Sequence, residues 1–191
     1  MTHRIGWLFG LACSLAAFAS AQAAAYPQIE FQPESARFTK ATEEYREIWR
    51  TEGERISAAL EAATGLEMEA GPIRAIVFEG ISNSGYKRFP MYMRASYSSD
   101  TKRATLVHEL AHRLISDYVS KDFEDHPVIF LFVYDVWVKL WGKEFADAQV
   151  EVESDRTGHY DYRTAWREAL ALGAEGRAER WKQFLNERRR R

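Results

Sequence analysis

Residues 99–118 read SDTKRATLVHELAHRLISDY. Its apolar side chains recur at steps of three and four residues, as they do on one face of an α-helix. Ser99 or Asp100 can cap the start of that helix, and the polar residues 120–122 follow its end. We therefore predict a helix that carries the run HELAH, residues 108–112, near its middle.

The run HELAH places three functional groups together on that helix. His108 and His112 are four residues apart, so both can direct an imidazole nitrogen to one divalent ion. Neutral imidazoles suit Zn²⁺, and a catalytic zinc site adds a third protein ligand and leaves a position for water. Glu109, beside the ligands, is the natural general base. The run predicts a zinc site that hydrolyses an amide bond.

Residues 105–114, TLVHELAHRL, resemble the active-site helix of the zincin metallopeptidases. The resemblance implies that His108 and His112 are zinc ligands, that Glu109 is catalytic, and that the substrate is a peptide or protein. Arg113 departs from the family pattern, which prefers an uncharged residue there. The residues that follow lack the glycine and histidine of the metzincin branch. The order of strands, active-site helix, short connection and second helix looks like the gluzincin branch, which takes a carboxylate ligand from the following helix.

Asp135 is the predicted third ligand. It is the only acid in residues 128–141, an apolar stretch that Pro127 opens and Gly142 ends. In an antiparallel helix hairpin, Asp135 and His112 are equally far from the turn and face each other. A carboxylate in an apolar helix is costly unless it is paired or binds a metal. Asp135 can alternatively orient a histidine or bind a buried arginine.

Three other residues are alternatives for the third ligand. Glu151 begins the run EVESDR, residues 151–156, which resembles the Glu-x-x-Ala-Asp run of one membrane-bound gluzincin group. Glu124 and His126 are the others. The stretch that follows residue 156 adds His159 and Tyr160, candidates for a hydrogen-bond donor to the oxyanion of the tetrahedral intermediate.

The pattern around the motif predicts an α+β fold that is mostly helical. Further helices are expected at residues 35–63, 128–141, 144–153, 162–172 and 174–188, and strands at residues 73–79 and 89–95. We expect a small antiparallel sheet packed on a helical core that contains the active-site helix hairpin. Pro90 favours an edge position for the second strand. The resemblance to zincins implies that an extended substrate adds to that edge, at Met91 to Ala95.

Composition indicates one exported domain. The chain has 191 residues, 46% of them apolar and 28% charged, which suits a single core. Residues 1–23 have the three parts of a secretory signal peptide, leaving a domain of residues 24–191 in the periplasm or outside the cell. Cleavage would remove Cys13, the only cysteine, so no disulfide could form. Lipid attachment at Cys13 is the alternative.

Charge and hydropathy exclude two classes of partner. A net charge of −2 gives no nucleic-acid signature, and the basic tail Arg188–Arg191 is typical of a solvated helix end. No segment of the mature chain is long and apolar enough to predict a membrane span.

The leading hypothesis is an exported zinc metallopeptidase. The alternative is a non-catalytic zinc-binding or partner-binding protein with a zincin-like fold. A di-iron bundle is a third reading, but it needs a second Glu-x-x-His element, which the sequence lacks.

Overall fold

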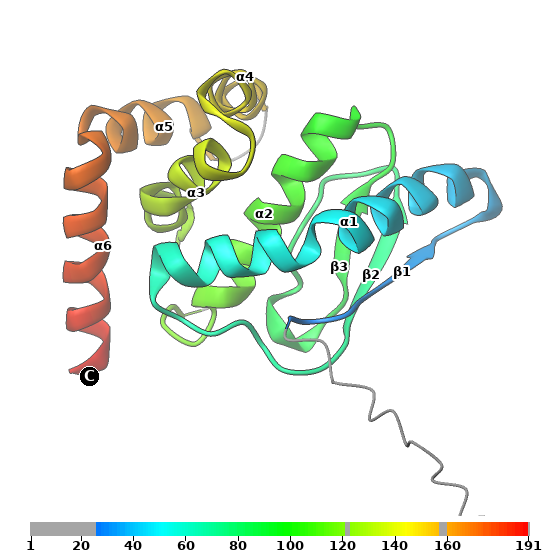
Figure 1. The fold of residues 1–191 in the computed structure, drawn as a ribbon, viewed down its shortest axis with the longest axis horizontal. Coiled ribbons are helices and arrows are strands. Elements are labelled where there is room, and N and C mark those ends of the chain that lie inside the picture. The colour runs from blue at the N-terminus through cyan, green and yellow to red at the C-terminus, as the bar shows by residue number, and fades with distance from the viewer. Residues whose placement is uncertain (1–25, 121–122, 157–159, 191) are drawn as a thin grey trace, which may run out of the picture.

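The computed structural model describes residues 26–120, 123–156 and 160–190 (Figure 1). The predicted signal peptide, residues 1–23, lies outside these residues, as does His159. In chain order the described elements are β1 (Ile29–Pro33), the 3-10 helix η1 (Ala36–Phe38), α1 (Thr39–Thr64), β2 (Ile73–Phe78), the 3-10 helix η2 (Tyr86–Arg88), β3 (Met91–Arg94), α2 (Ser99–Ile115), α3 (His126–Trp141), α4 (Lys143–Ser154), α5 (Tyr162–Ala171) and α6 (Gly173–Arg189). The predicted mostly helical α+β class is confirmed.

The three strands form a parallel sheet in the order β1-β2-β3, so the predicted antiparallel sheet is wrong. Ile29 pairs with Ile73, and Ala75 pairs with Met91. Two neighbouring parallel strands need a long connection, because the chain must return to the end of the sheet at which the first strand began. Helix α1 makes this return between β1 and β2, and residues 79–90 make it between β2 and β3. The sequence analysis missed β1, whose only buried residue is Phe31.

The outer edge of β3 is covered by the chain itself. The N–H of Asn83 donates to the carbonyl of Tyr92 at 3.0 Å, and the N–H of Tyr92 donates to the carbonyl of Asn83 at 2.9 Å. The N–H of Arg94 donates to Oγ of Ser82 at 3.0 Å. β3 is thus the last named strand, as Pro90 suggested, but its edge is already paired. The substrate position expected at Met91 to Ala95 is filled by residues 82–83.

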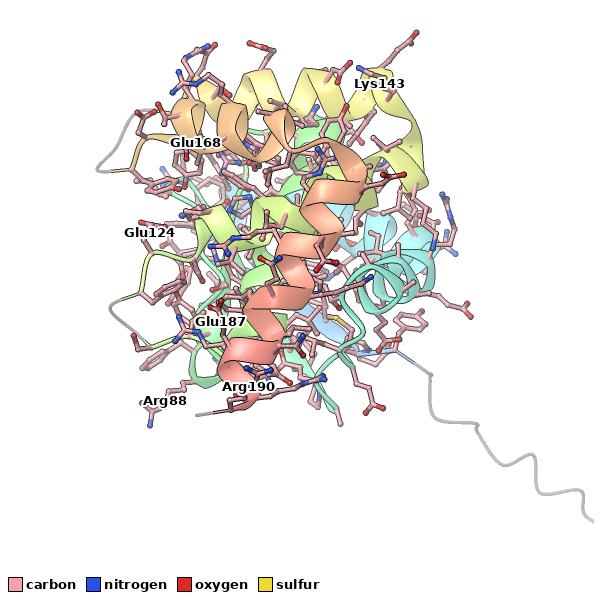
Figure 2. All side chains as sticks on the ribbon, turned by 90° about the vertical axis from the view of Figure 1, so that its left-hand side faces the viewer. Arg88, Glu124, Lys143, Glu168, Glu187 and Arg190 are labelled. Carbon is pink, nitrogen blue, oxygen red and sulfur yellow. The ribbon has the colours of Figure 1, made fainter. Side chains whose placement is uncertain are left out.

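Helix α3 lies in the middle of the helical part, as its apolar sequence predicts. It packs against α1, α2, α4, α5 and α6, and its fully buried Phe130 stacks on Trp166 of α5, with ring centroids 3.8 Å apart. Helix α6 stands on the side of the molecule away from the sheet (Figure 1), and Figure 2 looks onto it. Among the described helices, none combines the length and apolarity that crossing a membrane requires.

Candidate metal centre

Helix α2 carries the HELAH run inside the molecule. The Oγ of Ser98 accepts a hydrogen bond from the N–H of Thr101 at 3.1 Å, so the helix is capped one residue before the predicted Ser99. Its relative exposures are 1% for His108, 3% for Glu109 and 6% for His112. Solvated surface residues would not be buried to this extent, so a surface role for these side chains is excluded.

His126 completes a group of three imidazoles. It is the first residue of α3, where Pro127 suits the first helical turn. One ring nitrogen from each of His108, His112 and His126 lies within 4.8 Å of the others. The Nε2 atoms of His108 and His112 are 3.1 Å apart. The structure therefore brings together the two predicted ligands and His126, one of the alternatives for the third.

Each of the three histidines has a carboxylate beside its Nδ1 atom. The distances from Nδ1 to the nearest carboxylate oxygen are 2.8 Å from His108 to Glu153, 2.8 Å from His112 to Asp125 and 2.5 Å from His126 to Glu124. A carboxylate at Nδ1 holds the proton there and leaves the Nε2 lone pair free to bind a metal. The contact between His108 and Glu153 is a close approach of two buried atoms, and Oε1 of Glu153 also lies 3.3 Å from Nη2 of Arg156.

The surroundings shift the pKa values of the three imidazoles in different directions. Burial lowers the pKa of His108 to about 3, so its ring is neutral near pH 7. Burial alone would raise the pKa of Glu153, but the neighbouring His108 and the Arg156 guanidinium outweigh it and lower that pKa. Burial also lowers the pKa of His126, whereas the hydrogen bond with Asp125 outweighs burial at His112 and raises its pKa.

Glu109 lies beside the imidazoles and faces a cleft of about 380 Å³. Burial raises the pKa of its carboxyl group to about 7. A group with this pKa can both accept and release a proton near neutral pH, which a general base requires.

A neutral tyrosine also reaches the imidazoles. The Oη of Tyr162 is 3.0 Å from Nε2 of His126, and burial raises the pKa of Tyr162 to about 12, so the phenol keeps its proton. Tyr162 was not among the predicted site residues. Of the predicted oxyanion donors, Tyr160 instead stacks on the ring of His126, with centroids 4.5 Å apart, and His159 falls outside the described residues.

Arg113 explains why a charged residue can follow the motif. It is 4% exposed, and its Nη1 donates to the carbonyls of Ser84 at 2.8 Å and Phe89 at 3.2 Å. Its Nη2 donates to Oε2 of Glu69 at 3.0 Å. Ser84 and its neighbours line the cleft, so Arg113 fixes a wall of the candidate site to helix α2.

The structure places Asp135 away from the imidazoles. Its two carboxylate oxygens accept from Nη2 of Arg177 at 2.6 Å and from Nε at 2.9 Å. Asp135 follows His126 by nine residues, which is about two and a half turns of a helix, so the two side chains leave opposite faces of α3. The arginine pairing that the sequence left as an alternative is the arrangement found.

The other proposed carboxylate ligands also have different surroundings. Glu151 is exposed on α4. Glu153, two residues later, is 1% exposed and makes the contact with His108 described above. The acidic run 151–156 therefore contributes to the site, through a different residue and as a partner of a histidine. Glu124 likewise contacts His126.

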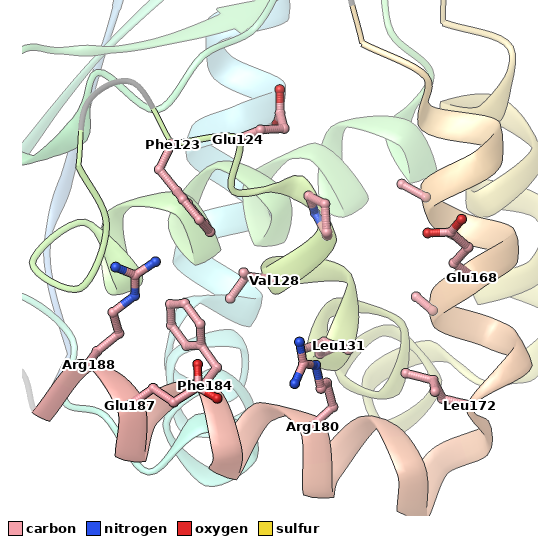
Figure 3. Close-up of a pocket in the computed structure, with 13 residues that line it drawn as sticks. Phe123, Glu124, Val128, Leu131, Glu168, Leu172, Arg180, Phe184, Glu187 and Arg188 are labelled. Carbon is pink, nitrogen blue, oxygen red and sulfur yellow. The ribbon is translucent and has the colours of Figure 1, made fainter. Parts of the chain in front are cut away.

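A larger groove of about 580 Å³ lies between α3, α5 and α6 (Figure 3). It borders the cleft, because Phe123 and Glu124 line both. Phe123 points into the groove toward Arg188 and Phe184 (Figure 3), and the Arg188 guanidinium lies 4.8 Å from the centre of the Phe123 ring. These contacts tie the segment before His126 to α6.

No family model, curated protein or solved structure matched the chain.

Of the groups beside the imidazoles, Asp125 and Tyr162 were not among the predicted site residues, and a sequence signal exists for Asp125 alone. Glu124, Asp125 and His126 are consecutive and stand directly before Pro127, at the junction where a helix begins. Such a junction offers two carboxylates and an imidazole over a short distance. Tyr162 had no comparable signal, because its position depends on how α5 packs beside α3.

Proposed function

We propose that the protein is an exported zinc-dependent peptidase in which His108, His112 and His126 hold the ion. One observation carries the proposal: three imidazoles lie within 4.8 Å of one another, and each has a carboxylate next to its Nδ1 atom. Carboxylate-supported histidines are typical of zinc ligands, and three histidines with an open cleft are typical of a catalytic site. The resemblance to zincins and the predicted signal peptide supply the substrate class and the location.

The donor set fits zinc. Zn²⁺ binds the neutral Nε2 of imidazole, and burial keeps His108 neutral. When bound, the ion supplies Lewis acidity, which lowers the pKa of water and polarises a carbonyl group.

The chain's own residues would then move the protons. Glu109 takes a proton from water as the water oxygen attacks the peptide carbonyl. The protonated Glu109 gives that proton to the leaving nitrogen when the C–N bond breaks. Tyr162, whose Oη lies 3.0 Å from Nε2 of His126, would donate its hydrogen bond to the carbonyl oxygen once that nitrogen holds the ion. Glu153, Asp125 and Glu124 keep the three imidazoles in the required tautomer.

The Glu109→Gln variant tests the proposal. We would measure hydrolysis of β-casein, an unfolded protein, by the zinc-loaded parent and by this variant. Glu109→Gln should keep one zinc per chain and lose about 100- to 10,000-fold in kcat, because it removes a proton acceptor and no ligand. Glu151→Gln is the matched control, since Glu151 is exposed, and it should keep the parent rate. Zinc binding without turnover by the parent would favour the non-catalytic alternative.

A further inference from the structure

Residues 81–89, here called the lip, contribute to the wall of the cleft and expose three large apolar side chains. Ile81 is 79% exposed, Phe89 is 68% exposed and Tyr86 is 37% exposed. Among the described residues, the remaining large apolar side chains with such exposure are Val152 and Leu172, which stand apart from the lip on α4 and at the end of α5. Between Ile81 and Phe89, the residues Ser82, Asn83, Ser84 and Tyr86 line the cleft. Tyr86 is thus both exposed and part of the cleft lining, and Ile81 directly precedes the lining residue Ser82 in the chain.

Hydrogen bonds to β3 and to α2 hold the backbone of the lip. The Asn83–Tyr92 hydrogen bonds fix one side of it to β3, and Arg113 binds the carbonyls of Ser84 and Phe89. Gly85 has a φ of +65°, and a side chain there would meet the Pro90 carbonyl oxygen at 2.3 Å. A surface that is already ordered loses little conformational entropy when a partner binds.

We propose that the lip binds apolar side chains of an unfolded polypeptide substrate next to the bond that is cut. The inference rests on the proposed peptidase function and adds a substrate class, extended chains with bulky apolar residues. Two observations favour this occupant. The first is that residues of the lip line the cleft, as described above.

The second observation is the charge of the lip, which disfavours an anionic lipid surface as the occupant. Lys87 is paired with Asp117 at 2.5 Å between Nζ and Oδ2. Arg88, whose side chain projects from the surface (Figure 2), is the other cation of residues 81–89. Binding to anionic lipid through charge needs clusters of about four to eight cations. The lip therefore offers apolar contact, which suits the side chains of an unfolded chain.

The test compares two double variants in a Glu109→Gln background, where substrate binds without being cut. Ile81→Ser with Phe89→Ser removes two apolar side chains of the lip. Val152→Ser with Leu172→Ser removes two exposed apolar side chains elsewhere, which are 42% and 47% exposed. We expect the Kd for fluorescently labelled β-casein to rise about tenfold or more in the lip variant. The control should stay within about twofold of the parent, and Phe89→Leu should largely preserve binding.

Three further results separate the possible occupants. An unchanged Kd for β-casein in the lip variant would overturn the inference. If the lip variant keeps β-casein binding but no longer floats with anionic vesicles, the occupant is lipid and the inference is overturned. If it keeps β-casein binding but no longer self-associates in sedimentation, the occupant is a second copy of the chain and the inference is likewise overturned. The Kd is measured without turnover, so it tests the lip alone. The peptidase proposal is tested separately, by the rate at which the parent protein with Glu109 cuts β-casein.

Discussion

His126 and Asp135 lie on the same helix, yet one meets α2 and the other meets α6. His126 opens α3 and joins His108 and His112, whereas Asp135 pairs with Arg177 on the opposite face. An acid in an apolar helix needs a partner, and Asp135 has one in Arg177. Arg177 follows Asp135 by 42 residues and lies on α6, so no local pattern in the sequence reveals the pair.

Substituting these two residues separates their roles. His126→Ala should lose stoichiometric zinc, because two imidazoles alone hold the ion weakly. Asp135→Ala should keep zinc and lose about 2 kcal/mol of unfolding free energy, because it leaves the buried Arg177 without its carboxylate. Metal analysis after dialysis and urea unfolding of both variants check this. Zinc loss in Asp135→Ala with a fully loaded His126→Ala would contradict the assignment.

The pKa of Glu109 predicts how stability depends on pH in the zinc-free protein. Burial raises this pKa from 4.5 in the unfolded chain to about 7, which corresponds to a cost of about 3 kcal/mol for the ionised form. Because the folded pKa is the higher one, the contribution of Glu109 to stability is fully present below about pH 4.5 and is lost as pH rises through 7.

Glu109→Gln removes this dependence. The variant should equal the parent near pH 5 and exceed it by about 2–3 kcal/mol at pH 8, with chelator present throughout. Denaturant unfolding across this range measures the difference, and Glu151→Gln should show no trend. A constant difference between Glu109→Gln and the parent at all pH values would show that Glu109 does not titrate as described.

Among the elements, Arg113 joins helix α2 to the lip. Arg113→Met keeps much of the side-chain volume but removes every hydrogen bond to Ser84, Phe89 and Glu69. We expect faster hydrogen exchange in residues 82–89, a loss of about 2–4 kcal/mol in stability and an unchanged zinc stoichiometry. Exchange measured by mass spectrometry tests this, and unchanged protection of residues 82–89 would contradict a fixing role for Arg113.

Helices and strands with local signals could be predicted from the sequence, but the way in which the strands pair could not. The spacing of Leu106, Leu110 and Leu114 together with a polar start defines α2, and Pro127 and Gly142 mark the ends of α3. The direction of the strands depends on connections that return across the sheet, and β1 is short with little buried surface. The same limit applies to the site: HELAH is local, whereas the place of His126 depends on how α3 meets α2.

At the scale of the whole molecule, the candidate centre lies where three parts of the chain meet. Helix α2 supplies His108, Glu109 and His112, the start of α3 supplies His126, and the end of α4 supplies Glu153. Helix α6 supports the segment before His126 through Phe184 and Arg188, which contact Phe123. The site therefore depends on the packing of the helical part as one core, and zinc should stabilise that core because its ligands come from separate helices.

The X-ray absorption spectrum of the zinc-loaded protein tests the central claim most directly. The account predicts one zinc per chain with three imidazole nitrogens at about 2.0–2.1 Å and at least one oxygen ligand from water. A protein that retains no zinc after dialysis, or a zinc shell with fewer than three imidazoles, would contradict it.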